Sequence, residues 1–128
     1  MFIKSEQRGR VGVLETLVIG HGLEGQVFDC GERKGLLLPL LGDHQLHNAS
    51  VVLSVVDSLI QQGWNITEEH IREGLKTVTW PGRFDIVSRD PLFIIDGGHN
   101  PQCIEALAKN IEDYLSDRRV IALTGVLA

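Results

Sequence analysis

The stretch D-G-G-H-N-P, residues 96–101, lies between a run of four apolar residues and a segment with helical spacing. A buried strand, a tight glycine-containing turn and a helix, in that order, are how an α/β sheet builds a ligand site. Asp96 is expected at the carboxyl end of the strand, and Asn100 is expected to cap the helix. A second apolar run at 120–123 predicts another strand, so residues 92–124 are predicted to form one βαβ unit.

The helix predicted after this turn begins with Pro101, and proline suits the first helical position. Its apolar residues recur at helical spacing and are expected to pack against the sheet; they are Ile104, Leu107, Ala108, Ile111 and Leu115. The chain stops directly after the second predicted strand, which would leave sheet edges unpaired. We therefore expect residues 84–128 to begin a domain whose remainder is missing, and the chain to be a fragment.

The overall composition is ordinary for a globular protein, with 43% hydrophobic and 23% charged residues, and 128 residues allow one core or parts of two. The net charge of −5 and the lack of a basic stripe argue against nucleic-acid binding. No run is apolar enough for a membrane span, and the first ten residues have no signal-peptide centre. Cys30 and Cys103 fit no metal-ligand spacing. These features predict a cytoplasmic protein with reduced thiols and no membrane association.

The first third of the chain is predicted to be rich in strands. The runs 11–19 and 26–30 flank the turn-like G-H-G-L-E-G and predict a β-hairpin. A third apolar run, 36–41, contains Pro39. Because proline cannot donate to a sheet ladder, this run is predicted to be an edge or irregular strand.

A long helix is predicted after these strands. It is expected to begin at Gly42, with Asp43 as its cap, and to end at Gly63. Its apolar residues are expected to form the buried face; they are Val51, Val52, Val55, Val56, Leu59 and Ile60.

A further helix is predicted from Thr67, with acidic residues in its first turn. Its capping box is expected to be incomplete, because His70 stands where Glu or Gln is preferred. The W-P-G stretch at 80–82 ends it, and we place the domain boundary there, between 1–80 and 81–128.

The first candidate cluster for binding is G-D-H-Q-L-H-N-A, 42–49, at the start of the long helix. His44, Gln45 and Asn48 could reach a ligand at that helix end, and an Asn amide offers the donor and acceptor that an adenine edge requires. The alternative is a solvated first helical turn. His44 and His47 could suggest a metal site, but the sequence offers no third ligand nearby.

The second candidate is W-P-G-R, in which a rigid Pro-Gly turn presents Arg83. A guanidinium binds oxyanions through two parallel hydrogen bonds, so this arginine is suited to a phosphate. The alternative is a domain linker with a solvent-facing arginine and a packing tryptophan.

The third candidate is the D-G-G-H-N-P stretch itself. Asp96 could accept hydrogen bonds from ribose hydroxyls, and His99 could donate to an anion or contact a base. The alternative is that Asp96 and Asn100 only tie the turn together. Neither a G-x-G-x-x-G fingerprint nor a G-x-x-x-x-G-K-[ST] phosphate loop is present, so nucleotide phosphates would need a cradle from elsewhere.

Three motifs in this order, L-x-G-D-H-Q-L-H-N-A at 40–49, W-P-G-R-F at 80–84 and I-I-D-G-G-H-N-P at 94–101, resemble the folylpolyglutamate synthase/dihydrofolate synthase family, a branch of the Mur ligase superfamily. The resemblance runs from about residue 25 to the end. The family's third motif usually reads D-G-A-H-N-P, so Gly98 is a departure. The resemblance implies an α/β fold: the C-terminal part of a central ATPase domain, followed by the first βαβ unit of a Rossmann-like C-terminal ligase domain.

The resemblance implies an ATP-dependent ligase that adds L-glutamate to folate or dihydropteroate. ATP with Mg²⁺ phosphorylates the carboxylate, and the glutamate amine attacks the acyl phosphate. Asn48 then corresponds to the adenine contact, Arg83 to the phosphate-binding arginine and Asp96 to the ribose or nucleotide contact, with His99 near the same nucleotide. No catalytic residue or metal ligand is assigned to this chain, because the family's phosphate loop and magnesium ligands lie upstream of the matched residues.

Two further expectations concern activity and domain motion. The fragment alone is expected to be inactive, and domain closure is expected to bring Arg83 and Asp96 onto one nucleotide. The alternatives are another Mur-superfamily amide ligase, of the peptidoglycan-precursor or cyanophycin type, and a non-catalytic nucleotide-binding module.

Overall fold

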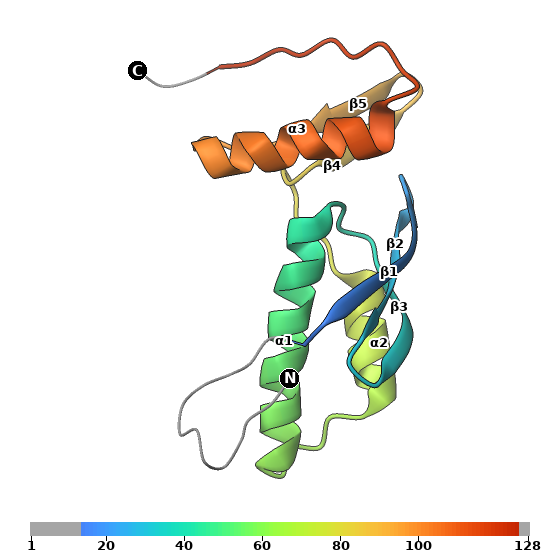
Figure 1. Cartoon of the computed structure of the whole chain (residues 1–128), viewed down its shortest axis with the longest axis vertical. Coiled ribbons are helices and arrows are strands. Elements are labelled where there is room, and N and C mark those ends of the chain that lie inside the picture. The colour runs from blue at the N-terminus through green and yellow to red at the C-terminus, as the bar shows by residue number, and fades with distance from the viewer. Residues whose placement is uncertain (1–13, 126–128) are drawn as a thin grey trace. The chain divides into compact units, whose positions relative to one another are not determined.

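The computed structural model describes residues 14–125, which form eight helices and strands in two compact units: unit 1 up to Thr79 and unit 2 from Trp80 (Figure 1). Each unit contains both helices and strands, so the predicted α/β class is confirmed.

Unit 1 contains a three-stranded antiparallel meander of β1 (Thr16–Gly22), β2 (Gly25–Cys30) and β3 (Arg33–Leu38). The predicted hairpin is β1–β2, with a two-residue loop between Gly22 and Gly25. The part of the first predicted strand before residue 14 lies outside the described residues. The third strand is an edge strand, as expected, and it stops directly before the proline at 39.

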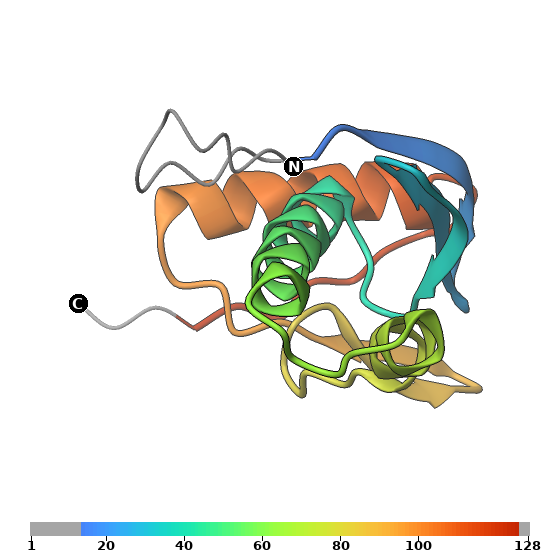
Figure 2. The same cartoon turned by 90° about the horizontal axis from the view of Figure 1, so that it is seen from below.

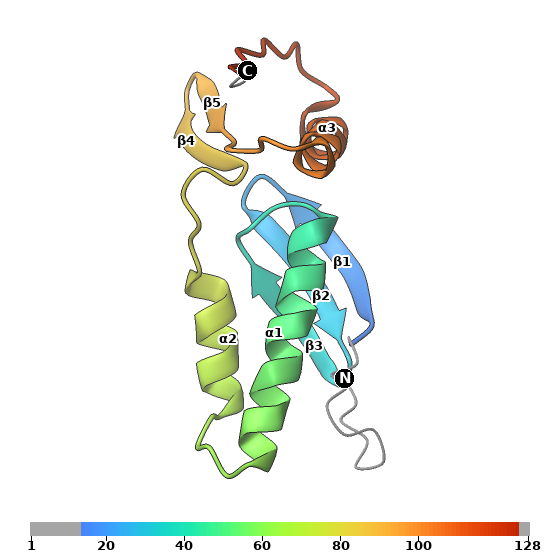
Figure 3. The ribbon, with the colours of Figure 1, turned by 90° about the vertical axis from the view of Figure 1, so that its left-hand side faces the viewer.

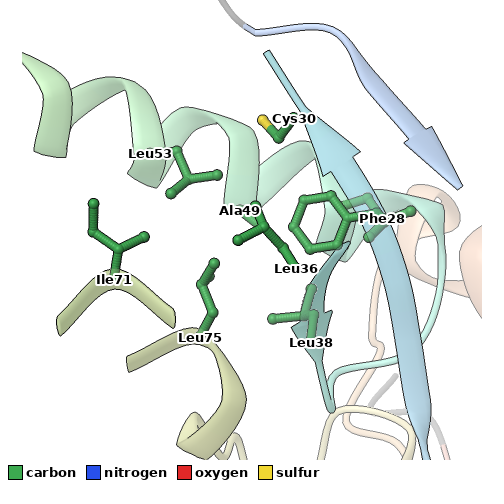
Figure 4. Close-up of a cluster of buried hydrophobic side chains, with 9 residues drawn as sticks. Phe28, Cys30, Leu36, Leu38, Ala49, Leu53, Ile71 and Leu75 are labelled. Atoms are coloured by element: carbon green, nitrogen blue, oxygen red, sulfur yellow. The ribbon is translucent and has the colours of Figure 1, made fainter. Parts of the chain in front are cut away.

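Two helices follow, α1 (Asp43–Gln61) and α2 (Glu68–Thr77), and both lie on the same side of the sheet (Figures 2 and 3). The strands contribute alternate side chains to the core between these layers, since residues i and i+2 share a face. Figure 4 shows the core, which consists of Phe28, Cys30, Leu36, Leu38, Leu46, Ala49, Leu53, Ile71 and Leu75.

The predicted buried face of α1 is mostly wrong, although Val56 is partly buried and packs against the core. Val52 is 53% exposed, and Val51, Val55 and Ile60 are exposed as well. The helix instead buries the side containing Leu46, Ala49 and Leu53 together with two serines, Ser50 and Ser54. The serine hydroxyls donate to backbone carbonyls of the helix itself, 2.8 Å from Ser50 Oγ to His47 O and 2.6 Å from Ser54 Oγ to Ser50 O. Small side chains with satisfied hydroxyls can therefore face the sheet closely.

The expectation about the start of α2 is also wrong, because its capping box is complete. The His70 N–H donates to Thr67 Oγ1 at 3.2 Å, and the Thr67 N–H donates back to His70 Nδ1 at 3.3 Å. A neutral imidazole nitrogen is an acceptor, so histidine can take the place of Glu or Gln here. At the other helix, Gly42 is the N-cap and Asp43 is the first helical residue.

Arg33, at the start of β3, joins the sheet to both helices. Its guanidinium makes a bidentate ion pair with Asp57 of α1 and a second contact, at 3.1 Å, with Glu68 of α2. The hydrogen bond that Arg33 donates to Asp57 raises the pKa of Arg33 further above its ordinary value. The G-E-R-K-G stretch that contains Arg33 therefore stabilises the packing of unit 1.

Unit 2 contains the antiparallel hairpin β4 (Asp85–Arg89) and β5 (Leu92–Ile95), followed by α3 (Pro101–Leu115) (Figure 1). The β5–turn–α3 order agrees with the prediction. Residues 120–123 are not a strand in the structure, so the second strand of the βαβ unit is absent from the described part. A strand forms only when its backbone groups pair with a neighbour, and within the described residues β5 pairs with β4 alone, so residues 120–123 have no strand partner there. In the predicted apolar face of α3, Leu115 is buried but Ile104 is 51% exposed.

Candidate functional site

The W-P-G-R-F stretch forms a tight turn directly before β4. The Arg83 N–H donates to the Trp80 carbonyl at 3.3 Å, with Pro81 and Gly82 at the two central positions. Gly82 has φ of 75°, the left-handed value that the third residue of a type II turn requires and glycine adopts without strain. The predicted Pro-Gly turn is therefore present, and it presents Arg83 at its end.

This turn is hydrogen-bonded to the D-G-G-H-N-P stretch. The Phe84 N–H donates to Asp96 Oδ2 at 2.8 Å, and the Gly97 N–H donates to the Gly82 carbonyl at 2.8 Å. The two motifs thus form one local structure within unit 2. Because these bonds already hold the Arg83 turn against Asp96, domain closure is not needed to bring their backbones together.

Asp96 and Asn100 organise the start of α3. Asp96 Oδ1 accepts from the Gly98 N–H at 2.7 Å, and Asn100 Oδ1 caps the helix by accepting from the Cys103 N–H at 2.9 Å. The interpretation that these two residues tie the turn together is therefore confirmed. Each carboxylate oxygen has two lone pairs, so these bonds do not exclude a ligand hydroxyl at Asp96.

His99 is exposed, and its ring has a defined orientation. Nδ1 lies 3.2 Å from the Gly97 carbonyl oxygen. A carbonyl only accepts, so this contact requires the proton on Nδ1. The neutral side chain then offers Nε2 to solvent as an acceptor.

Gly98 occupies a position with little space. A Cβ atom there would lie 2.8 Å from Asp96 Oδ1 and 3.0 Å from the Cys103 Cβ. Both distances are shorter than a Cβ atom normally tolerates. In this structure, the lack of space for a side chain therefore accounts for glycine in place of the alanine of D-G-A-H-N-P.

Arg83 itself is half-buried and differs from Arg33 of unit 1, which is ion-paired. Within residues 14–125 its guanidinium makes no ion pair or side-chain hydrogen bond. Such a group retains its donors for an external oxyanion. Trp80, at the other end of the turn, is 56% exposed.

Asn48 lies on the second turn of α1 in unit 1, where it is exposed. Its Nδ2 donates to Gln45 Oε1 at 3.2 Å. Of the three residues predicted to reach a ligand at this helix end, His44 and Asn48 are exposed. Gln45 is buried and is therefore not available at the surface. Among the described residues, no group of three or more His, Cys, Asp or Glu side chains could hold a metal ion.

Two residues that the sequence analysis did not single out shape these segments. Gln26 is buried in β2 and donates from Nε2 to the Leu40 carbonyl at 2.7 Å and to the Gly42 carbonyl at 3.2 Å, which fixes the loop entering α1. Asp85 accepts from the Gly82 N–H at 3.0 Å. Two sequence signals could have indicated these roles. Gln26 is a polar residue on the apolar side of a strand, and Asp85 is a carboxylate three residues after the turn glycine Gly82.

The chain is similar in sequence to known ligases. Residues 82–128 match the family described as Mur ligase, glutamate ligase domain. Folylpolyglutamate synthase of Lacticaseibacillus casei is 34% identical over 113 residues, covering 84% of this chain and 26% of the relative. The chain belongs to the folylpolyglutamate synthase/dihydrofolate synthase family.

Solved structures of this family have the same fold. Folylpolyglutamate synthase of Thermotoga maritima matches with a TM-score of 0.68 at 35% identity, over 81% of this chain and 25% of that one. A complex of folylpolyglutamate synthase (FPGS) with the ATP analogue AMPPCP and folate matches with a TM-score of 0.69 at 31% identity. The match covers 79% of this chain and 26% of that one. The chain thus spans about a quarter of the length of these family members. None of the helices that the structure describes is long and apolar enough to cross a membrane.

Proposed function

We propose that this chain forms part of an ATP-dependent ligase that joins L-glutamate to folate or dihydropteroate through an acyl phosphate. The observation that carries the proposal is the hydrogen-bonded pairing of the W-P-G-R-F turn with the D-G-G-H-N-P turn, in a chain whose solved relatives include an FPGS complex with an ATP analogue and folate. The folate-ligase names of the relatives favour this branch over peptidoglycan-precursor and cyanophycin ligases.

The reaction requires transfer of the γ-phosphoryl group of ATP to a substrate carboxylate, which gives ADP and an acyl phosphate. The glutamate amine then attacks the acyl carbon and inorganic phosphate leaves. Negative charge on the transferred group must be stabilised throughout the first step, and preorganised cationic donors do this effectively. Arg83 is the residue of unit 2 proposed for this role, because its backbone is held and its guanidinium has no partner among the described residues.

The other proposed contacts are to the nucleoside. Asn48 is proposed to bind the adenine edge through its amide, and Asp96 is proposed to accept from the ribose in addition to its two backbone donors. His99 is proposed to contact the nucleotide through Nε2. Magnesium is not assigned to any described residue, because no suitable group of carboxylates is present among them.

The domain assignment belongs to the same proposal. Residues 1–80 would be the end of the central ATPase domain and residues 81–128 the start of the C-terminal ligase domain. The match of residues 82–128 to the glutamate ligase domain supports the second assignment. The 128-residue chain alone is proposed to lack ligase activity.

The experiment is an ATP-dependent ligation assay on the complete enzyme that contains this segment, with labelled glutamate and with folate or dihydropteroate as acceptor. Arg83→Ala is expected to lower kcat/KM for ATP roughly 100-fold, because a charged phosphate contact is lost, and to leave folate binding unchanged. Arg119→Ala, an exposed arginine of the same unit, is the matched control and is expected to retain full activity. Wild-type enzyme without ligation, or Arg83→Ala with unchanged ATP kinetics, would contradict the proposal.

A further inference from the structure

Carboxylates hold the backbone on both sides of Arg83. On one side, the Gly82 N–H donates to Asp85 Oδ2 at 3.0 Å. On the other side, the Phe84 N–H donates to Asp96 Oδ2 at 2.8 Å. The Gly82 carbonyl is held as well, since it accepts from the Gly97 N–H at 2.8 Å. The residue proposed to bind phosphate therefore lies in a segment with three fixed backbone groups.

The conformation of Phe84 shows that this segment is constrained by its surroundings. Phe84 has φ of 46°, a left-handed value that a bulky side chain rarely adopts. Its ring is buried and lies near the ring of Tyr114, with centroids 6.0 Å apart. Such a conformation persists only where neighbouring contacts impose it. The hydrogen bond to Asp96 and the packing of the ring are those contacts. Both therefore help to fix the backbone at Arg83, and with it the direction in which the Arg83 side chain extends.

We propose that Asp85 is a positioning residue for Arg83, an inference that rests on the proposed function. Asp85 is the first residue of β4 and pairs with Ile95 of β5, so the hairpin fixes its backbone. Its carboxylate in turn fixes Gly82, the residue directly before Arg83. Asp85 acts on the nucleotide only through this turn, by holding the guanidinium where it meets the phosphates.

The chemistry of this hydrogen bond provides a test that separates positioning from charge. A carboxylate accepts strongly from an N–H group, and Asn at the same position still offers a carbonyl oxygen of similar reach. Alanine offers no acceptor. If the hydrogen bond to Gly82 is what matters, Asp85→Asn will retain most of the function that Asp85→Ala loses.

The experiment measures steady-state kinetics of the complete ligase with Asp85→Ala, Asp85→Asn and, as a matched control, Asp117→Ala, whose side chain is 79% exposed in the same unit. Asp85→Ala is expected to lower kcat/KM for ATP about tenfold, the effect of losing one charge-assisted hydrogen bond, with KM for glutamate unchanged. Asp85→Asn is expected to stay within about threefold of wild type, because its side-chain oxygen still accepts from Gly82.

Three results would overturn the inference while the proposed function stands: wild-type ligation with unchanged ATP kinetics in Asp85→Ala, an equal loss in Asp85→Asn, or an equal loss for glutamate. Absence of ligation by the wild type would instead overturn the proposed function, and this inference with it. Hydrogen exchange of the 128-residue chain checks that β4 and β5 stay protected in Asp85→Ala. If that variant unfolds unit 2, the ATP kinetics of Asp85→Asn decide: retained kinetics support positioning, and a tenfold loss overturns it.

Discussion

The backbone N–H of Phe84 and the carboxylate of Asp96, 12 residues apart, are joined by a hydrogen bond of 2.8 Å. The second oxygen of the same carboxylate accepts from Gly98 at 2.7 Å. Asp96 therefore links the end of the W-P-G-R-F turn to the start of the D-G-G-H-N-P turn. The residue proposed to contact the ribose therefore also holds together the two segments of unit 2 that contain Arg83 and His99.

Removal of the Asp96 carboxylate is expected to destabilise unit 2 directly. Asp96→Ala leaves the N–H groups of Phe84 and Gly98 without their acceptors, which should cost roughly 2–3 kcal/mol for two hydrogen bonds to a charged, half-buried group. Asp96→Asn keeps one acceptor and should cost about half as much. Amide hydrogen exchange in β5 and α3 of the 128-residue chain measures the effect locally. Exchange rates as slow as those of the wild type in Asp96→Ala would show that these bonds contribute nothing to stability.

Replacement of Gly98 by alanine is expected to destabilise unit 2, although alanine is the usual residue at this position of the family motif. The added Cβ would lie 2.8 Å from Asp96 Oδ1, an atom held by its bond to the Gly98 N–H, and 3.0 Å from the Cys103 Cβ. Gly98→Ala should therefore destabilise unit 2 by about 1–3 kcal/mol through overpacking.

Gly97→Ala is the matched control for this prediction, because its Cβ would approach only the Gly82 carbonyl oxygen, at 3.4 Å. It should change the stability by no more than about 0.5 kcal/mol, as for a surface substitution. Urea unfolding followed by exchange of the α3 amides gives both values. Equal stability of the two variants would mean that the turn relaxes around either methyl group.

The features of this chain that sequence predicts correctly are those that depend on neighbouring residues alone. The end of β5 and the start of α3 were predicted well, because Asn100 and Pro101 act within a single helical turn. The strand at 120–123 was not found in the structure, because a strand depends on a partner that local apolar character does not provide. β4 was missed because its residues, D-I-V-S-R, alternate too weakly to indicate a strand.

The face of α1 shows a second reason for error. Its valines suggested the buried side, yet Ser50 and Ser54 are fully buried while Val52 is exposed. Nothing in the sequence shows that the serine hydroxyls return to the carbonyls of their own helix. In the candidate site, residue types correctly indicated that Arg83 follows a Pro-Gly turn, but the pairing of that turn with Asp96 is a non-local contact and needed the structure.

Two glycines of unit 1 are expected to respond in opposite ways to alanine. Neither Gly74 in α2 nor Gly35 in β3 has an atom within 4 Å of the added Cβ, so steric contact does not distinguish them. Gly74 is within a helix, where alanine should stabilise by roughly 0.5–1 kcal/mol through helix propensity and reduced freedom of the unfolded chain. Gly35 has φ of 61°, and alanine there should destabilise by about 1 kcal/mol. Local exchange of the α2 and β3 amides measures each change, and destabilisation by Gly74→Ala would contradict the helical assignment.

The stability of unit 1 is expected to fall in acid partly through Asp29. The Gly35 N–H donates to Asp29 Oδ1 at 2.9 Å, and this bond, assisted by Lys34, lowers the pKa of Asp29 below its ordinary value of 3.8. The folded state therefore binds fewer protons than the unfolded state, so the contribution of Asp29 is complete above pH 3.8 and is lost as the pH falls through the lower value of the folded state.

Asp29→Asn is expected to remove this part of the acid dependence, since the amide does not titrate in that range. The measurement is the free energy of unfolding of unit 1 between neutral pH and strongly acidic pH, from the exchange of β2 and β3 amides. Asp117→Asn in unit 2 is the matched control and should leave the unit 1 profile unchanged. A profile as steep in Asp29→Asn as in the wild type would assign the acid sensitivity of unit 1 to other groups.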